Sequence, residues 1–139
     1  MIINSEQEMQ DLGKSFTKQL NSSRNSATVI ELVGDVGTGK TTFTRGLATG
    51  LGITTPVTSP SFTISKSYAL PANNGYLIHY DFYRLPDPGL MLDDLQENLK
   101  NPRNIIIIEW GESISSILPK NHITISIKYN DDGSRKVTL

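Results

Sequence analysis

Apolar residues recur at helical spacing near the start of the chain. They share one helical face: Met9, Leu12, Phe16 and Leu20. Ser5 is followed three residues later by Glu8, which is the spacing of a capping box, where the two side chains satisfy N–H groups at the start of a helix. We predict an amphipathic packing helix after Ser5, followed by a polar loop over residues 21–26.

Two continuous apolar runs predict strands that are buried in a sheet. The first covers residues 28–33, and the second is the run of four isoleucines at 105–108, which is typical of a central strand covered on both faces. A helix is predicted after the first strand, with Phe43, Leu47 and Leu51 on one face. Gly46 and Gly50 weaken this helix prediction, and a glycine at 52 is a typical C-cap.

An antiparallel hairpin is predicted between these two buried strands. Its strands alternate apolar and polar residues, with the apolar positions at Phe62, Ile64, Tyr68, Leu70, Tyr76, Ile78 and Tyr80. Asn74-Gly75 is the signal of a two-residue hairpin turn. Residues 54–61 contain two prolines and many hydroxyl groups, so we expect an exposed, extended loop before the hairpin. The sheet should therefore mix parallel and antiparallel strands.

The last third of the chain predicts one more helix and two more strands. Asp87-Pro88 is typical of a helix cap and first turn, and Leu92, Leu95 and Leu99 follow on one face. Isoleucines at 123, 125 and 127 alternate with polar residues, residues 130–133 form a turn, and residues 134–139 are predicted to return as an edge-like strand.

Composition narrows the class of protein. A chain of 139 residues has the length of one domain, which we expect to span residues 1–139. The net charge of −1 and the sequence pI of about 6.1 predict no broad basic surface, so a role on tRNA or DNA would depend on a partner. No cysteine is present, which excludes disulfides and thiolate sites. We expect a cytoplasmic protein with no membrane span.

One motif at the end of the first buried strand predicts phosphate chemistry. Residues 34–41 fit G-x-x-x-x-G-K-[ST], with a strand before them and a helix after them, as a phosphate-binding loop requires. Glycines let successive N–H groups face one concavity where a side chain would block phosphate. The alternative is a glycine-rich turn that caps an ordinary helix. The predicted nucleotide-binding residues are Gly34, Asp35, Val36, Gly37, Thr38, Gly39, Lys40, Thr41 and Thr42.

Two residues of this loop have distinct predicted roles. Lys40 would reach the β- and γ-phosphates, and the Thr41 hydroxyl would bind the Mg²⁺ that bridges them. With the mixed sheet predicted above, the loop indicates an α/β fold of the P-loop NTPase-like type, a three-layer sandwich around a mixed central sheet.

Acidic residues that end strands are the next candidates, because ligands of open α/β sheets collect at the carboxyl ends of the strands. Glu109 ends the isoleucine strand and matches the second acidic group that reaches the metal in P-loop enzymes, although a solvated loop residue is the alternative. Asp81 could assist at the metal or orient the attacking water, and Arg84 could pair with a phosphate or with a partner's carboxylate. Alone, these two are more often a cap and a surface ion pair, and His79 is more often a core histidine. Trp110 fits either packing or a contact surface.

Four motifs in order resemble one family. They are G-D-V-G-T-G-K-T-T (34–42), S-P-S-F-T (59–63), H-Y-D-F-Y-R (79–84) and I-E-W (108–110), and together they resemble the bacterial TsaE ATPase family of tRNA threonylcarbamoyladenosine modification. The resemblance covers residues 5–128. It implies an ATP- and Mg²⁺-dependent ATPase of the complex that makes N6-threonylcarbamoyladenosine at position 37 of tRNAs reading codons that begin with adenine. Such an ATPase supports turnover and does not transfer the carbamoyl group itself.

The same resemblance implies partners and residue roles. The partners would be the transferase subunit and its scaffold paralogue, of the TsaD and TsaB type, with tRNA reached only through the complex. Lys40 would bind phosphate, Thr41 and Glu109 would hold Mg²⁺, and Asp81 would assist at the metal or the water. The residues of a switch-like loop or a partner contact would be Ser59, Pro60, Ser61, Arg84 and Trp110.

The chain also departs from the family pattern. Residues 89–94 are more apolar than the acidic segment the family often has there, and Met9 stands where the family often has a threonine. Two other functions stay open, a nucleotide-sensing binding module and a small P-loop kinase. A GTPase is disfavoured because no N-K-x-D segment is present, and a kinase because the five arginines are scattered.

Overall fold

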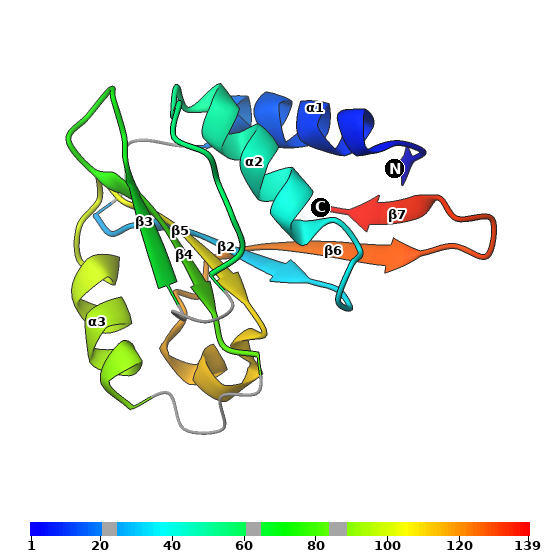
Figure 1. The fold of residues 1–139 in the computed structure, drawn as a ribbon. Coiled ribbons are helices and arrows are strands. Elements are labelled where there is room, and N and C mark those ends of the chain that lie inside the picture. Colours follow the sequence, from blue (N-terminus) through cyan, green and yellow to red (C-terminus); the bar gives the residue numbers. More distant parts are fainter. Residues whose placement is uncertain (21–24, 61–64, 84–88) are drawn as a thin grey trace.

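The computed structural model describes residues 1–20, 25–60, 65–83 and 89–139. Its centre is a seven-stranded sheet with the strand order β1-β7-β6-β2-β5-β4-β3 (Figure 1). The strands are β1 (Ile2–Ile3), β2 (Thr28–Val33), β3 (Ser65–Ala69), β4 (Tyr76–Asp81), β5 (Ile105–Glu109), β6 (Ile123–Tyr129) and β7 (Arg135–Thr138). The four central strands are parallel, whereas β3, β7 and β1 each run antiparallel to a neighbour, so the predicted mixed sheet is confirmed.

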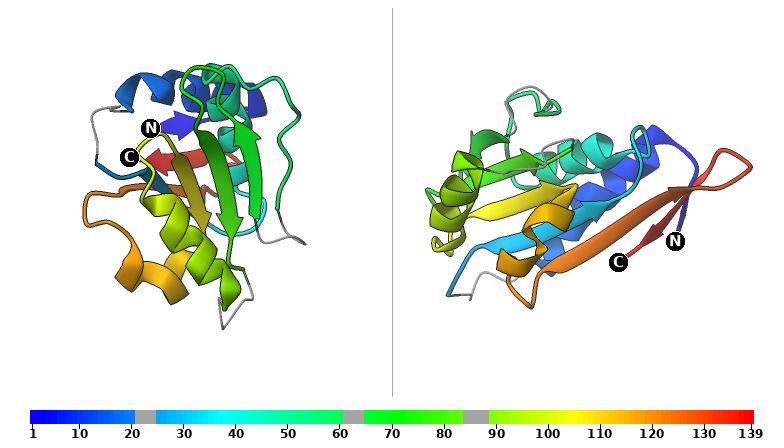
Figure 2. Two further views of the ribbon diagram at one scale, coloured as in Figure 1. Left: turned by 90° about the vertical axis from the view of Figure 1, so that its left-hand side faces the viewer. Right: turned by 90° about the horizontal axis from the view of Figure 1, so that it is seen from below.

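Helices cover both faces of the sheet and complete the predicted three-layer sandwich (Figures 1 and 2). Helices α1 (Glu6–Phe16) and α2 (Lys40–Gly50) lie together on one face, and α3 (Leu90–Leu99) lies on the other with the 3-10 helix η2 (Gly111–Ile117). Strand β5 contributes Ile107 to the core under α1 and α2, and its neighbours Ile106 and Ile108 to the core under α3. The prediction of a central strand buried on both faces is therefore confirmed.

Glycines set the distance between α1 and α2. A Cβ at Gly46 would lie 2.0 Å from the carbonyl oxygen of Gln10, and a Cβ at Gly13 would lie 2.2 Å from that of Phe43. Because these positions lack a side chain, the two helix backbones touch, and Phe16 packs edge-on against Phe43 at 5.8 Å between ring centroids. Gly46 thus supports the packing of α2, although its local effect on a helix is unfavourable.

The N-terminal helix begins as predicted and ends earlier. The Ser5 hydroxyl accepts a hydrogen bond from the Glu8 N–H at 3.1 Å, while Glu8 itself accepts from the Asn4 N–H at 2.7 Å. Helix α1 ends at Phe16 and a 3-10 turn, η1 (Thr17–Gln19), follows, so Leu20 packs against the core from beyond the helix.

The hairpin is confirmed, but its predicted two-residue turn is wrong. Pairing ends where the Leu70 N–H donates to the Gly75 carbonyl at 2.9 Å, so residues 71–74 form a four-residue turn with φ of 60° at Asn74. Gly75 is required for another reason, because a Cβ there would lie 2.2 Å from the Arg103 carbonyl oxygen. The predicted apolar positions Phe62 and Ile64 lie outside the described residues.

Two predictions near the ends of elements also need comment. Helix α3 begins at Leu90 after Gly89, and the predicted cap at Asp87-Pro88 lies outside the described residues. The last strand, β7, was predicted to be edge-like, but the short strand β1 pairs with it, and the N-terminal amine donates to the Val137 carbonyl at 3.0 Å. Sequence patterns missed β1 because two residues are too short for a period.

Candidate functional site

The carboxyl ends of the central parallel strands bring the predicted acidic residues together. Glu109 on β5 is in register with Asp81 on β4 and with Leu32 on β2, two residues before Gly34. The loop that follows β2 leads directly into α2, so its glycines, the two carboxylates and the start of a helix meet at one edge of the sheet. This is the edge where open α/β sheets hold their ligands.

The loop over residues 34–39 needs glycine at three positions. Gly37 and Gly39 have φ of +81° and +113°, values that side chains disfavour. A Cβ at Gly34 would lie 2.4 Å from the carbonyl oxygen of Ile127 on β6. Gly39 is the N-cap of α2, so the N–H groups of residues 40–42 have no partner within the helix, and the Phe43 N–H is the first to bond, to the Gly39 carbonyl. The backbone therefore forms a cradle that suits an anion.

Lys40 is buried and folds back over its own loop. Its Nζ donates to the carbonyl oxygens of Gly34 at 2.6 Å and Asp35 at 2.8 Å. The same Nζ lies 3.8 Å from Glu109 Oε1 and 5.3 Å from the centroid of the Trp110 ring. A positive charge is thus held at the loop by two neutral backbone carbonyls and one carboxylate.

A cavity of about 380 Å³ joins these groups, which is within the size range of small-molecule sites. Asp81 lines it with Lys40, Thr41 and Thr42 from the start of α2. The described residues that line it are Val36, Gly37, Gly39, Lys40, Thr41, Thr42, Ser59, Asp81, Tyr83 and Trp110. Most of the predicted nucleotide-binding loop therefore opens into the same space as Asp81.

Glu109 is buried and does not line this cavity, but its Oε1 lies 3.8 Å from Nζ of Lys40, which does. Its exposed fraction is 4%, and its Oε2 is hydrogen-bonded to Nε2 of His79, which is fully buried. His79 was interpreted as a core histidine, and its contact with Glu109 was missed. The signal that could have found it is the period of two along β4, which places His79 on the same face as Asp81, two residues before this register partner of Glu109.

Asp81 is half-buried at the mouth of the site. Burial raises the pKa of its carboxyl from the ordinary value of 3.8, and the nearby Glu109 charge raises it further. The hydrogen bond from the Tyr83 N–H at 2.9 Å and the charges of His79 and Lys40 lower that pKa in part. Proximity to Glu109 is thus electrostatically unfavourable, and a cation between the two carboxylates would relieve it.

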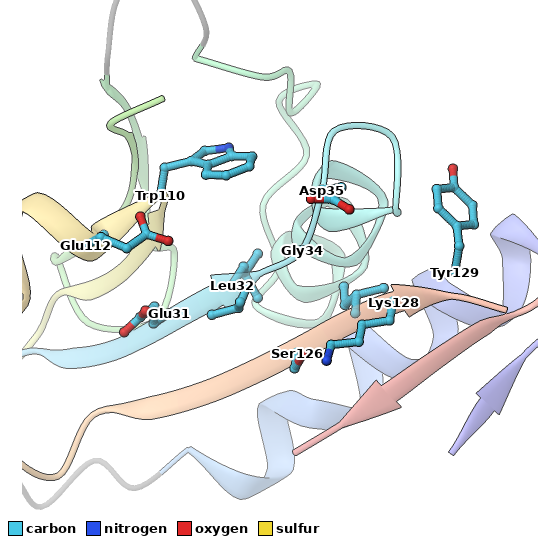
Figure 3. Close-up of a pocket in the computed structure, with 12 residues that line it drawn as sticks. Glu31, Leu32, Gly34, Asp35, Trp110, Glu112, Ser126, Lys128 and Tyr129 are labelled. Atoms are coloured by element: carbon cyan, nitrogen blue, oxygen red, sulfur yellow. The ribbon is translucent and has the colours of Figure 1, made fainter. Parts of the chain in front are cut away.

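Trp110 connects this cavity to a second one. It has φ of 56°, its ring lies 4.8 Å from that of Tyr83, and it lines both cavities. The second cavity, of about 450 Å³, lies along β2, β6 and the start of the loop, with Glu31, Glu112 and Lys128 around it (Figure 3). It contains neither Lys40 nor Asp81, so the smaller cavity is the candidate nucleotide site.

The predicted switch-like residues are only partly described. Ser59 lines the candidate site and Pro60 is buried, whereas Ser61 and Arg84 lie outside the described residues. The loop was predicted to be exposed, and this is confirmed for residues 54–56, 58 and 59, whereas Val57 and Pro60 are buried. The Val57 carbonyl accepts a hydrogen bond from Arg45 Nε at 3.0 Å, and the Thr58 N–H donates to the Tyr68 hydroxyl at 3.3 Å. These two hydrogen bonds anchor the middle of the loop to α2 and to β3.

Two further features of the described residues bear on the site and on the class of protein. In the part of the chain that the structure describes, no group of three or more His, Asp or Glu side chains is arranged to hold a metal ion. Few protein ligands are expected for Mg²⁺, which is usually bound through one or two side chains and substrate phosphates. Over the same residues, no helix has the length and apolar character needed to cross a membrane.

Comparisons with known proteins agree on one family. The family model described as "Threonylcarbamoyl adenosine biosynthesis protein TsaE" matches residues 3–137. A Bacillus subtilis protein named tRNA threonylcarbamoyladenosine biosynthesis protein TsaE is 42% identical over 115 residues, covering 80% of this chain and 68% of that protein. A Haemophilus influenzae protein of the same name is 37% identical, covering 91% of this chain and 79% of that protein.

A solved structure matches as well. The crystal structure of YdiB from Bacillus subtilis superposes with a TM-score of 0.75 at 32% sequence identity, covering 99% of this chain and 80% of that one.

Proposed function

The chain belongs to the TsaE family of threonylcarbamoyl adenosine biosynthesis proteins, and we propose that it serves tRNA modification as a Mg²⁺-dependent ATPase. Its role in threonylcarbamoyladenosine biosynthesis follows from the family. The observation that carries the ATPase proposal is the meeting of Lys40, Thr41 and Asp81 around one cavity, with the buried Glu109 beside Lys40. These are the parts that phosphoryl transfer to water requires: an anion cradle, a metal-binding hydroxyl and carboxylates beside it.

The residues would divide the work as follows. The N–H groups at the start of α2 bind the β- and γ-phosphates, and Lys40 Nζ exchanges the carbonyl oxygens of Gly34 and Asp35 for phosphate oxygens. The Thr41 hydroxyl and Glu109 hold Mg²⁺, which when bound with ATP neutralises charge on the β and γ oxygens. Asp81, at the mouth of the site, orients the attacking water and accepts its proton.

The site has an open rim that a partner could close. Val36 and Tyr83 line the cavity and expose 67% and 41% of their surface. Water exclusion and final placement of the catalytic groups often come from an element that closes over the substrate. We propose that the transferase subunit and its scaffold paralogue, of the TsaD and TsaB type, provide this closure in the cytoplasm. With a net charge of −1, the chain would reach tRNA only through them.

The test is steady-state phosphate release by the purified chain, alone and with both partner proteins from the same source. We expect ATP binding but slow turnover alone, well below the ~10 s⁻¹ typical of enzymes. Adding both partners should raise the rate at least roughly tenfold, which requires only about 1.4 kcal/mol from the contact. The Lys40→Ala variant, tested in parallel, reports any contaminating ATPase.

The outcomes separate the competing functions. Full-speed turnover by the chain alone, or no change with both partners, would contradict the partner-completed site. Binding of ATP without turnover under any condition would instead favour the nucleotide-sensing module. Because binding coupling is reciprocal, ATP should also tighten docking on the partners if they favour the ATP-bound chain.

A further inference from the structure

One buried side chain beside the candidate site has no role in the proposal above. His79 lies on β4 with an exposed fraction of 0%, and its register partner on β5 is Ile107. Two residues earlier on the same face of β4, the equally buried Leu77 fills the core with apolar atoms. Burying the polar imidazole ring at this position has a desolvation cost that a leucine side chain would not have. The hydrogen bond to Glu109 has to offset this free-energy cost.

The hydrogen-bond pattern determines which ring nitrogen carries the proton. Nε2 of His79 faces Oε2 of Glu109, and a carboxylate oxygen can only accept, so Nε2 is the donor. Nδ1 is buried and has no hydrogen-bond partner among the residues that the structure describes. The geometry therefore describes a ring that donates from Nε2 to Glu109.

This contact orients the Glu109 carboxylate. Oε2 accepts the hydrogen bond from His79, and Oε1 lies 3.8 Å from Nζ of Lys40, the first residue of α2. A glutamate side chain has several rotamers, and a carboxylate held at one oxygen keeps the other in a fixed direction. Partners of this kind behind a metal-binding group typically contribute 10–100-fold to affinity or activity.

We propose that His79 is a positioning residue, which holds Glu109 so that Oε1 faces the metal and the γ-phosphate. The proposal rests on the ATPase function proposed above. His79 touches neither nucleotide nor water in this account, and it acts only through Glu109. Replacement of His79 should therefore lower the rate of ATP hydrolysis and leave nucleotide affinity largely unchanged.

The test compares three variants of the full chain. His79→Leu fills the space without a donor, His79→Gln keeps an N–H donor for Glu109, and Leu77→Ala is a buried control on the same face of the same strand. Trp110, the single tryptophan of the chain, reports nucleotide binding by its fluorescence, because its ring lies over Lys40. Phosphate release is measured with both partner proteins, and ATP binding is titrated with and without Mg²⁺.

We expect His79→Leu to bind ATP without Mg²⁺ within about threefold of wild type, but to lose about 10–100-fold in turnover and to need severalfold more Mg²⁺ for half-saturation. His79→Gln should recover a large part of both losses, while Leu77→Ala should lower only the melting temperature. Wild-type turnover in folded His79→Leu, or equal losses in His79→Gln and His79→Leu, would overturn the proposal.

The Mg²⁺ titration keeps this proposal separate from the ATPase function. If wild type binds Mg-ATP but never hydrolyses it, the ATPase proposal fails, and the half-saturating Mg²⁺ concentration still tests His79. An unchanged value in His79→Leu then overturns the positioning role. If His79→Leu does not fold, the same comparison is made between His79→Gln and wild type, where a Mg²⁺ requirement within about twofold of wild type supports a donor role and a tenfold increase contradicts it.

Discussion

Strand β5 has a buried polar side chain at each end, and the two are satisfied in different ways. Asn104, just before the strand, is 2% exposed, and Glu109 at its end is 4% exposed. The Asn104 side chain accepts from the Tyr76 N–H at 3.0 Å and donates to the Asn98 carbonyl at 3.1 Å, so its partners are neutral backbone groups. Glu109 instead carries a charge, and its partners are the side chains of His79 and Lys40.

This difference separates stability from function along a single strand. At the first end, hydrogen bonds of Asn104 tie β4, the end of α3 and β5 together. At the second end, His79 Nδ1 lacks a partner among the described residues, and Lys40 Nζ donates hydrogen bonds to carbonyl oxygens of its own loop. An unpaired buried nitrogen and two neighbouring carboxylates, Asp81 and Glu109, are unfavourable for stability. Such arrangements are typical of functional sites, where a bound ligand can supply the missing interactions. Each prediction below tests whether the two ends can be altered independently.

Replacement of Lys40 should have the largest effect. Lys40→Ala removes the positive charge from the cradle, and we expect Mg-ATP affinity to fall by about 100-fold or more, since truncating one partner of a buried charge pair, here the proposed pair of lysine and phosphate, typically costs about 2–5 kcal/mol. The free energy of unfolding should fall less, because the contact of Nζ with Glu109 is long at 3.8 Å and Glu109 keeps its hydrogen bond to His79. Calorimetric titration with Mg-ATP measures the affinity. Binding equal to wild type would remove the phosphate-loop interpretation.

Replacement of Asn104 should affect the opposite property. Asn104→Ala leaves the Tyr76 N–H and the Asn98 carbonyl without partners, so the free energy of unfolding should fall by about 2–3 kcal/mol. Turnover per folded molecule should stay near wild type. Denaturant unfolding measures the first and phosphate release the second. Asn101→Ala, at an exposed neighbour whose side chain accepts from the Arg103 N–H, is the matched control and should cost less than about 1 kcal/mol.

The two ends also differ in how far the sequence predicts them. The isoleucine run, the glycine motif and Glu109 carry periodic or spaced signals, and with the alternating pattern of the hairpin they predicted the fold class and its mixed sheet. Asn104 carries no such signal, and the period of two along β4 gives the face of His79 but not its partner. These partners are the Asn98 backbone, reached through a turn, and Glu109, reached through strand register. Interactions between elements depend on register and turn length, and local patterns do not specify these.

Glycines illustrate the same limit. Gly37 and Gly39 were recognisable because a known loop geometry requires positive φ at those places. Gly46 and Gly75 were misinterpreted as a weak helix position and a turn residue, since what they avoid is the backbone of a distant element. The position of β1 beside β7 was missed for a related reason, because a two-residue strand is determined by its partner.

Replacement of Thr41 should give a moderate and specific effect. Thr41→Ala removes the hydroxyl proposed to bind Mg²⁺, so the half-saturating Mg²⁺ concentration should rise by about tenfold, or 1.4 kcal/mol, while metal-free ATP binding is kept. Thr49→Ala on the same helix, whose hydroxyl donates to the Arg45 carbonyl, is the control and should leave the Mg²⁺ requirement unchanged. A Mg²⁺ requirement equal to wild type in Thr41→Ala would exclude the hydroxyl as a ligand.

Replacement of Asp81 should have the smallest effect on stability, and the effect should depend on pH. Because the folded pKa of this carboxyl is raised, the native chain binds more protons than the unfolded chain between 3.8 and the raised value, and stability falls as pH rises through that window. Asp81→Asn removes this cost. The variant should be slightly more stable than wild type at neutral pH, by less than about 1 kcal/mol since solvent screens a half-buried group.

Measuring this gain at several pH values tests its origin. The gain should disappear below pH 3.8, where the carboxyl is protonated in both the folded and the unfolded chain. Urea unfolding of both proteins at neutral and acidic pH provides the comparison. A loss of stability in Asp81→Asn at neutral pH would contradict the unfavourable placement of Asp81 beside Glu109.

The most direct test of the separation between the two ends is Glu109→Gln, measured by phosphate release at saturating Mg-ATP with both partner proteins present. The substitution keeps the shape of the side chain and removes its charge. We predict that ATP still binds and that the free energy of unfolding is not lowered. Turnover should fall by at least about 100-fold, as when a group that stabilises transition-state charge is removed. Turnover like that of wild type, with ATP bound, would contradict this prediction.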